Sequence, residues 1–196
     1  DSILLRILSC LNILSKVHFI HRYIGGVFQA QVEVLMTKQV RLLIIDPQND
    51  FCDLPESWQI TNPLSGQRIA PALPVTGAHA DMQRLATLIR QAQSAITDIY
   101  VTLDSHHRVD IAHPPFWAQA DGSPVSPFTM INAQQVRDGL YVPKDAAALP
   151  RVLAYLDELE ARGRYTLMIW PIHCEIGTWG HNVHADVQSA CNAWED

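Results

Sequence analysis

The order of apolar and polar positions along the chain predicts alternating strands and helices. Residues 40–46 form a short, nearly all-apolar run rich in branched side chains, which is typical of a parallel strand buried on both faces. Residues 80–95 repeat apolar side chains at helical spacing, and residues 98–103 form a second apolar run. This β-α-β order predicts two parallel strands joined by a right-handed crossover.

The rest of the chain continues this alternation less regularly. Residues 54–78 and 105–143 are rich in Pro, Gly and polar side chains, so we expect long loops there, the second of them functional. Helical spacing returns in residues 146–161, an apolar strand is expected in 165–170, and a last helix in 184–194. The whole pattern predicts an α/β fold.

Composition narrows the class of protein. A length of 196 residues, 48% of them hydrophobic and 17% charged, fits one soluble globular domain. The net charge of −6 and the lack of a Lys/Arg cluster argue against nucleic acid as a partner and favour a small molecule. The four cysteines show no CxxC pair and no dense spacing, which favours a reducing, cytoplasmic compartment over a secreted disulfide framework.

The first 35 residues differ from the remainder because they mix apolar runs with basic side chains and contain few acids. Their longest uncharged apolar stretch, residues 7–15, is shorter than the roughly 20 residues that cross a bilayer, so no membrane partner is expected. A targeting segment is the alternative that stays open. We expect Met36 to be the natural start, with residues 1–35 an extension and 36–196 the functional domain.

Three groups of polar residues follow the three expected strands at or just after their ends. They are Asp46-Pro47-Gln48-Asn49-Asp50-Phe51, then Asp104-Ser105-His106 with His113 further on, then Trp170-Pro171-Ile172-His173-Cys174. The carboxyl ends of parallel strands face the ligand crevice of an open α/β sheet. Imidazoles with a carboxylate suit zinc, iron or manganese, so the pattern predicts a divalent metal site, with zinc the first choice. A surface position would account for His113 almost as well.

Together, the strings DPQNDF, DSH and WPIHCEIGTWG resemble successive motifs of the nicotinamidase and isochorismatase superfamily of cysteine hydrolases, over residues 41–184. The resemblance implies a three-layer α/β/α sandwich around a parallel sheet, here incomplete at the C-terminus. It implies hydrolysis of a small carbon–nitrogen amide through a cysteine thioester, with the metal holding the substrate, and often a homo-oligomer. The residues that it implies are a general base, two aromatic substrate contacts and four metal ligands: Asp46; Phe51 and Trp170; Asp104, His106, His113 and His173.

Several residues of these strings also suit purely structural roles. Phe51 and Trp170 fit a place in the hydrophobic core as well as they fit a substrate pocket. Asn49 and Asp50 are expected to hold loop geometry through bonds from their side chains to the backbone, rather than to act in catalysis.

The chain departs from the family pattern at two catalytic positions. The family's lysine follows the WPxHC motif, whereas all lysines of this chain, Lys16, Lys38 and Lys144, precede it. Neither Cys174, inside the metal motif, nor Cys191, in the last expected helix, matches the family's nucleophile. Because loss of a nucleophile removes most of the rate, we expect this chain alone to be inactive or nearly so.

Three alternatives to a nicotinamidase-like amidase remain. The isochorismatase branch works without the metal, and the histidine-rich pattern argues against it. A catalytically dead metal-binding module would keep the ligands and lack the nucleophile. A fragment whose parallel sheet exposes an apolar edge would fold poorly.

Overall fold

A computed structural model describes residues 39–163 and 165–196 of the chain. The proposed extension, residues 1–35, and the proposed start at Met36 lie outside the described residues. In residues 39–163 and 165–196, no helix is long and apolar enough to cross a membrane.

The first half of the chain folds as its apolar pattern predicts. Strands β1 (Arg41–Ile45) and β4 (Asp98–Thr102) pair in parallel, with Leu42 opposite Ile99. Helix α1 (Ala78–Ala92) connects them and ends in a 3-10 turn, η3 (Gln93–Ala95). The predicted β-α-β unit is therefore confirmed.

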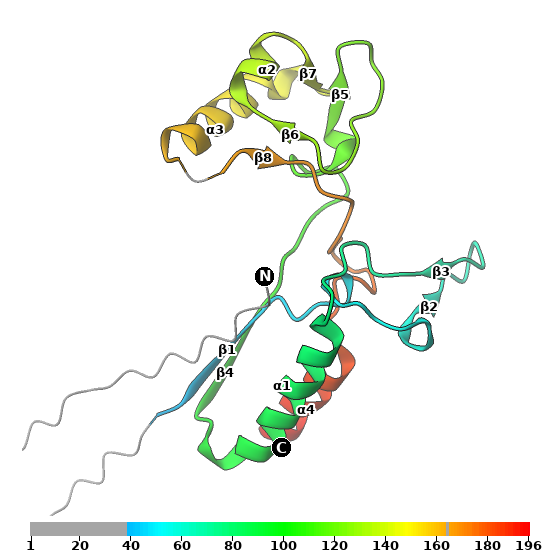
Figure 1. The fold of residues 1–196 in the computed structure, drawn as a ribbon, viewed down its shortest axis with the longest axis vertical. Helices are drawn as coiled ribbons and strands as arrows, with labels where there is room; N and C mark the ends of the chain where they lie inside the picture. Colours follow the sequence, from blue (N-terminus) through cyan, green and yellow to red (C-terminus); the bar gives the residue numbers. More distant parts are fainter. Residues whose placement is uncertain (1–38, 164) are drawn as a thin grey trace, which may run out of the picture.

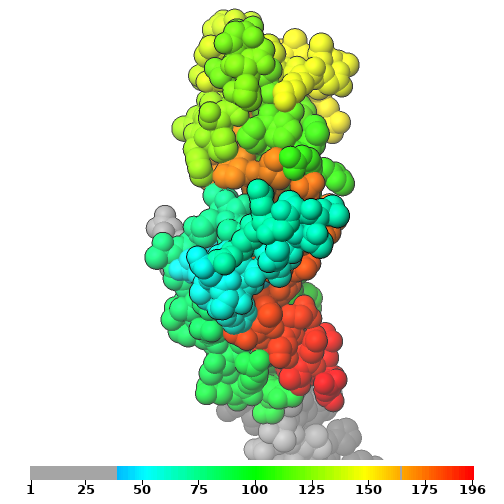
Figure 2. Space-filling view, turned by 90° about the vertical axis from the view of Figure 1, so that its right-hand side faces the viewer, coloured from blue at the N-terminus to red at the C-terminus, as the bar shows by residue number. Residues whose placement is uncertain are grey.

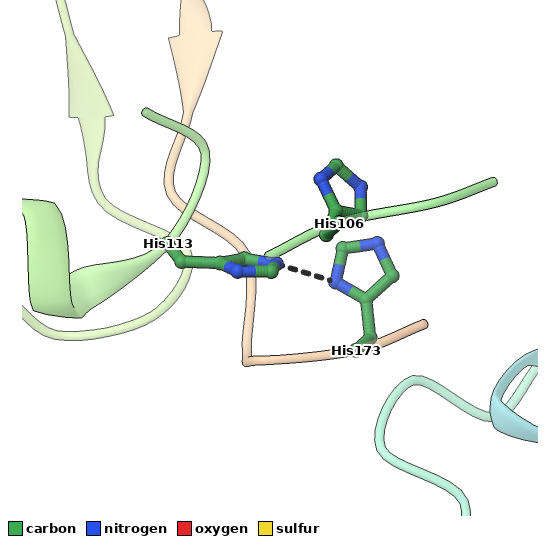
Figure 3. A group of neighbouring side chains, drawn as sticks. All are labelled: His106, His113 and His173. Atoms are coloured by element: carbon green, nitrogen blue, oxygen red, sulfur yellow. Dashed lines mark hydrogen bonds between the residues drawn. The ribbon is translucent and has the colours of Figure 1, made fainter. Parts of the chain in front are cut away.

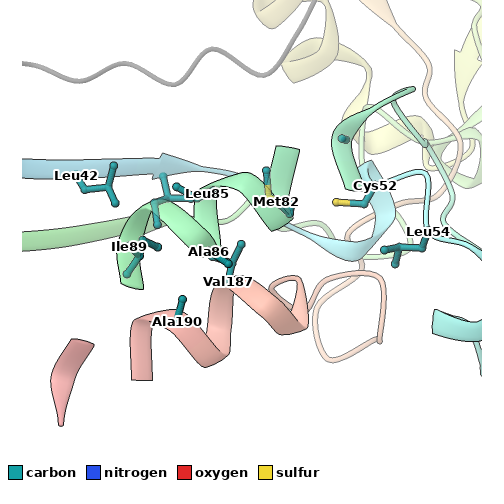
Figure 4. Close-up of a cluster of buried hydrophobic side chains, with 11 residues drawn as sticks. Leu42, Cys52, Leu54, Met82, Leu85, Ala86, Ile89, Val187 and Ala190 are labelled. Atoms are coloured by element: carbon teal, nitrogen blue, oxygen red, sulfur yellow. The ribbon is translucent and has the colours of Figure 1, made fainter. Parts of the chain in front are cut away.

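Helix α4 (Ala185–Glu195) returns from the far end of the chain and packs against α1. Together with β1, the two helices form a buried cluster that we call the first core (Figure 4). Its residues are Leu42, Ile44, Cys52, Leu54, Ala78, Met82, Leu85, Ala86, Ile89, Val187 and Ala190. The helix expected in 184–194 is confirmed, with Val187 buried and Cys191 only half-buried.

A second core lies between residues 111 and 169, where the sequence predicted one long loop, one helix and one strand. Helix α3 (Leu149–Ala161), preceded by η5 (Ala146–Ala148), confirms the expected helix. The loop expectation for 105–143 was wrong, because that stretch also contains η4 (Pro114–Phe116), β5 (Trp117–Gln119), β6 (Met130–Ile131), α2 (Ala133–Arg137) and β7 (Tyr141–Pro143). Strands of two or three residues are too short to show a period of two in the sequence.

The expectation of a strand over 165–170 was only partly right. Strand β8 covers Leu167–Met168 alone and pairs antiparallel with β6, not with β1 or β4. Leu167 and Ile169 are buried in the second core, so the apolar run fills that core and does not extend the parallel sheet. An apolar run shows that a segment is buried, but it cannot show against which partner.

The segment expected as a loop over 54–78 contains a small antiparallel hairpin. Turn η1 (Asn49–Phe51) and turn η2 (Glu56–Trp58) precede β2 (Ile60–Thr61) and β3 (Arg68–Ile69). In the space-filling view this segment, coloured cyan, covers the front of the molecule near the junction of the two cores (Figure 2).

The described residues therefore form a mixed α/β fold with a small parallel sheet. Leu42 and Ile44 of β1 are buried on the side of α1 and α4, whereas Ile45 and Tyr100 are 41% and 53% exposed. Helices α2 and α3 belong to the second core, which Figure 1 shows above the first. A full three-layer sandwich is thus not present in the described part of the chain, and it stays a prediction.

Candidate metal centre

Two connecting segments, residues 103–113 and 169–176, join the first core to the second and lie side by side (Figure 1). The backbone N–H of Trp170 donates to the carbonyl of Ala112 at 2.7 Å. The N–H of His106 donates to the carbonyl of Cys174, and the N–H of Ile176 donates back to the carbonyl of His106, each at 3.0 Å. These bonds bring into contact two segments that are far apart in the sequence.

Three histidines from these segments form one cluster: His106, His113 and His173 (Figure 3). One ring nitrogen of each lies within 4.8 Å of those of the other two, and the ring centroids are 4.7 to 5.2 Å apart. His113 and His173 are buried, and His106 is mostly buried. The structure thus brings together the three histidines that the sequence pattern selected, and His113 is not a surface residue.

The outer nitrogens of two rings face backbone carbonyls. Nδ1 of His113 lies 3.2 Å from the carbonyl of His107, and Nδ1 of His173 lies 2.7 Å from the carbonyl of Pro171. A carbonyl can only accept, so both Nδ1 atoms carry a proton. Nε2 of His113 is 3.2 Å from Nδ1 of His173 (Figure 3), which suits it as an acceptor. A neutral ring that offers an Nε2 lone pair is the form that binds a metal.

Asp104 completes the cluster. Its carboxylate oxygens lie 3.0 Å from Nε2 of His106 and 3.1 Å from Nε2 of His173. The approach of a ring nitrogen to a carboxylate is favourable only if a proton or a cation lies between them. Three imidazole nitrogens and a carboxylate oxygen suit a divalent transition metal, and this donor set alone does not select between zinc, iron and manganese.

Burial keeps one ring of the cluster neutral. Desolvation lowers the pKa of His113 below its ordinary value, and the neighbouring His106 and His173 lower it further because positive charges repel. The neutral ring can use its lone pair for a metal.

Gln48 holds Asp104 in position, a role that the sequence did not reveal. Its side chain is fully buried, and its amide donates to the carbonyl of Asp104 at 2.8 Å and to that of His181 at 2.9 Å. Its Oε1 accepts from the N–H of Asp104 at 2.8 Å. The sequence shows that Gln48 belongs to the DPQNDF string. Its hydrogen-bond partners, however, are 56 and 133 residues away, and only the fold identifies them.

Asn49 and Asp50 act on loop geometry, as expected. The Asn49 amide donates to the carbonyl of Trp179 at 2.8 Å. The Asp50 carboxylate accepts from the N–H of Ala72 at 3.0 Å and from that of Cys174 at 2.7 Å, next to the ligand candidate His173. Both side chains thus tie the loop after β1 to the returning segment.

Asp46 lies directly after β1 in a left-handed backbone conformation, with φ 49°. Such a conformation is costly for a residue other than glycine and often occurs at functional sites. The hydroxyl of Thr102 donates to Asp46 Oδ1 at 2.7 Å, which fixes the half-buried carboxylate. Its role as general base stays a prediction.

The two candidate aromatic contacts have different surroundings. Phe51 is half-buried and meets the ring of His173 edge-on, with centroids 5.6 Å apart, so it lies at the histidine cluster. Trp170 is 36% exposed and packs edge-on against Phe128 at 5.9 Å. Phe51 is therefore in contact with a ligand candidate, and the role of Trp170 stays a prediction.

The cysteines near the site are unsuited to act as nucleophiles in this structure. Burial raises the pKa of Cys174 far above its ordinary value, and the nearby Asp50 raises it further. Burial also raises the pKa of Cys52 to about 12. The reactive form of a cysteine is the thiolate, which both environments disfavour.

A second histidine pair, His79 and His184, lies in the first core and was not assigned from sequence. His184 is fully buried, caps α4 through Nδ1, and lies with Nε2 2.9 Å from Nδ1 of His79. Trp58 stacks on the His184 ring at 4.9 Å. Burial, and then the neighbouring His79, lower the pKa of His184 to about 4. This pair ties α1 to the start of α4.

Comparison with known proteins found similarity only among solved structures. No family model and no curated protein matches the chain. The chain is similar to the yeast nicotinamidase Pnc1p bound to the inhibitor nicotinaldehyde, with 17% identity, a TM-score of 0.46, and coverage of 80% of this chain and 53% of that one. It is also similar to an Acinetobacter baumanii nicotinamidase pyrazinamidase, with 18% identity, a TM-score of 0.40, and coverage of 77% of this chain and 46% of that one. The chain spans about half the length of these nicotinamidases.

Proposed function

We propose that this chain binds a divalent metal, zinc in the first place, through Asp104, His106, His113 and His173, as part of a nicotinamidase-like amidase. The observation that carries the proposal is a cluster of three imidazoles, two of them buried, with ring nitrogens within 4.8 Å of one another, and a carboxylate within 3.1 Å of two of the rings. The resemblance of the DPQNDF, DSH and WPIHC strings to nicotinamidase motifs supports the choice of reaction class.

The substrate proposed is a small heteroaromatic amide. When bound, the metal supplies a Lewis-acidic position for the ring nitrogen of such a substrate. Phe51, which meets His173 edge-on, would contact the ring, and Trp170 is the second candidate for this contact. Asp46, oriented by Thr102, would accept the proton of the attacking group.

The proposal assigns the role of nucleophile to none of the cysteines that the structure describes. Cys174 and Cys52 are buried with raised pKa values, and Cys191 is half-buried in α4 with a raised pKa caused mainly by burial. We therefore expect the described part of the chain to bind metal and the substrate ring but to release no ammonia. A catalytically dead metal-binding module is the second candidate, favoured by the same protected thiols.

Metal content and ammonia release, measured on the purified full chain, test the proposal. The protein is stripped with a chelator and titrated with zinc, iron(II) or manganese(II), and Co(II) is used as a spectroscopic substitute. We expect one metal per chain, and a change in the Co(II) absorption spectrum when nicotinamide is added, without ammonia release. His173→Ala should weaken metal binding by more than about 100-fold, because it removes a ligand itself, whereas loss of a supporting contact costs about 10–100-fold.

A matched control is His107→Ala. His107 is exposed, adjacent to His106, and contributes only its backbone carbonyl to His113, which alanine retains. This variant should bind metal like the wild type. Metal binding without any response to nicotinamide would favour the binding module, and no metal binding at all would refute both candidates. Ammonia release would refute the assignment of the cysteines.

A further inference from the structure

Phe128 has a backbone conformation that is unusual for a bulky side chain. Its φ is 66°, in the left-handed region. Pro127 and Phe128 are the central residues of a turn before β6, and Phe128 stands where a type II turn requires a positive φ and normally contains glycine. A side chain in this conformation crowds the following backbone, so Phe128 is strained.

Two backbone hydrogen bonds hold this turn against the end of β8. The N–H of Phe128 donates to the carbonyl of Ile169, and the N–H of Ile169 donates to the carbonyl of Thr129 at 2.8 Å. Ile169 itself is fully buried in the second core. The strained turn is therefore fixed to a buried residue that leads directly to Trp170.

The ring of Phe128 points to the surface. It is 58% exposed and meets Trp170 edge-on, with the ring centroids 5.9 Å apart and the ring planes at 84°. In this arrangement the edge of one ring touches the face of the other, so the contact covers neither face of the first ring. Because apolar surface stabilises a fold only where it leaves water, this ring does little to offset the strain of its backbone.

Trp170 connects this aromatic pair with the candidate metal centre. Its N–H donates to the carbonyl of Ala112 at 2.7 Å, and Ala112 directly precedes His113. His173 follows Trp170 three residues later in the sequence. The aromatic pair thus lies on the same two connecting segments as the ligand candidates.

The other strained residues also belong to the candidate site. In residues 39–163 and 165–196, the non-glycine residues with a positive φ are Asp46, Phe128 and Cys174. Asp46 is the candidate base, and Cys174 directly follows the ligand candidate His173. Strained residues cluster at active sites and ligand contacts, where the surrounding structure holds them for a function.

We propose that Phe128 is a specificity-determining residue: together with Trp170 it contacts the planar ring of a heteroaromatic amide, and the strained turn holds its side chain in place for this contact. The inference rests on the proposed function for the reaction and the metal. It adds selectivity, because aromatic rings stack on a flat aromatic substrate and gain nothing comparable from an aliphatic amide.

The experiment measures the binding of nicotinamide and of azide to the Co(II)-loaded full chain, through the Co(II) absorption spectrum. Nicotinamide has a ring for Phe128 to contact, whereas azide binds the metal alone. In Phe128→Gly, nicotinamide affinity should fall by about 2–10-fold, which corresponds to the loss of one aromatic pair, and azide affinity should stay unchanged. The midpoint of urea unfolding should stay the same or rise, because glycine adopts a positive φ without strain.

Two further variants separate the ring from the strain. Phe128→Tyr keeps the ring and should bind nicotinamide like the wild type. Phe128→Leu keeps an apolar side chain and the strained backbone but has no aromatic face, so its nicotinamide affinity should fall as in the glycine variant. The leucine variant tests the role of the ring even if Phe128→Gly does not fold.

Leu140→Gly is the matched control. Leu140 is an exposed apolar residue directly before β7, and its φ lies outside the left-handed region. Glycine at this position only adds freedom to the unfolded chain, so the urea midpoint should fall while nicotinamide affinity stays unchanged.

Each contrary outcome has a separate meaning. Equal nicotinamide affinity in the wild type and in Phe128→Leu overturns the inference and leaves the proposed metal site untouched. A urea midpoint that falls as far in Phe128→Gly as in Leu140→Gly overturns it too, because the ring would then serve the fold. A wild type that binds azide but not nicotinamide refutes the proposed substrate, and this inference with it.

Discussion

Gln48 and Asp104 are joined by two hydrogen bonds that run in opposite directions. The Gln48 amide donates to the carbonyl of Asp104, and the N–H of Asp104 donates to Oε1 of Gln48, both at 2.8 Å. A side-chain amide here replaces the backbone of a neighbouring strand at the position where β4 has ended. The consequence is that a metal-ligand candidate is fixed by a side chain from the loop after β1.

Gln48→Ala should therefore weaken both the fold and metal binding. The substitution leaves half-buried backbone groups of Asp104 and His181 without partners, which costs on the order of 3 kcal/mol in the free energy of unfolding. Zinc affinity should fall by about 10-fold or more. Urea unfolding and a zinc competition assay measure the two effects.

Gln119→Ala is a control of the same chemistry. The Gln119 amide donates to the carbonyl of Pro124 at 3.0 Å in an exposed hydrogen bond of β5. It should change stability by less than about 0.5 kcal/mol and leave zinc affinity unchanged. Equal effects of the two variants would refute the special role of Gln48.

Gly180 lies against Asp50, whose N–H donates to the carbonyl of Gly180 at 3.0 Å. A Cβ at this position would overlap the Asp50 carboxylate, which also accepts from the N–H of Cys174. Gly180→Ala should displace Asp50 and destabilise the fold by about 2 kcal/mol or more, as overpacking does. Gly122→Ala, at φ 83° but in open space, measures backbone strain alone and should cost about 1 kcal/mol. Equal losses in urea unfolding would argue against the overlap.

Acidification should destabilise the first core through His184. The pKa of His184 is lowered to about 4 in the folded chain, against an ordinary value near 6.5. The unfolded state therefore binds more protons between these two values, so stability is full above about pH 6.5 and falls as the pH is lowered to about 4. The loss due to this residue amounts to ~3 kcal/mol.

The His184→Asn variant isolates that contribution. Asparagine can still cap α4 but does not titrate. Its unfolding free energy should be lower at pH 7, because the contacts with Trp58 and His79 are lost, but it should fall less steeply as the pH is lowered from about 6.5 to about 4. An unchanged slope in urea unfolding at several pH values would show that other groups carry the acid sensitivity.

Cys174 should resist alkylation in the folded protein. Its side chain is fully buried and its pKa is raised by burial, so little thiolate is present near pH 8. Peptide mapping after iodoacetamide treatment should find Cys174 unmodified in the native chain and modified in urea. Rapid modification of Cys174 without denaturant would contradict its assignment as an inert thiol.

The sequence was sufficient for the parts of the fold that have long, regular patterns. Strands β1 and β4 and helix α1 follow one another closely in the sequence. Each has enough apolar positions to show the period of its secondary structure. The second core could not be predicted, because its strands are two or three residues long and pair across distant positions such as Met130 and Met168. Tertiary packing, not local pattern, decides those pairings.

The candidate site, like the fold, has one part that the sequence predicts and another that only the structure shows. Because Asp and His side chains bind metals, the sequence was enough to select Asp104, His106, His113 and His173. The fold brings these residues together. Gln48 has an ordinary polar side chain, and only its surroundings distinguish it from other Gln residues. The histidines were predictable from their chemistry, whereas their supports required the geometry.

The two connecting segments have a mechanical consequence. His106 and His113 lie on the segment that leaves the first core, and His173 lies on the segment that returns to it. A cation shared by these rings would act as a removable cross-link that closes the whole second core into one loop, and so lowers the entropy of the unfolded chain. In the metal-loaded chain the two cores would then melt as one cooperative unit, whereas removal of the metal would let each of them open at its own temperature.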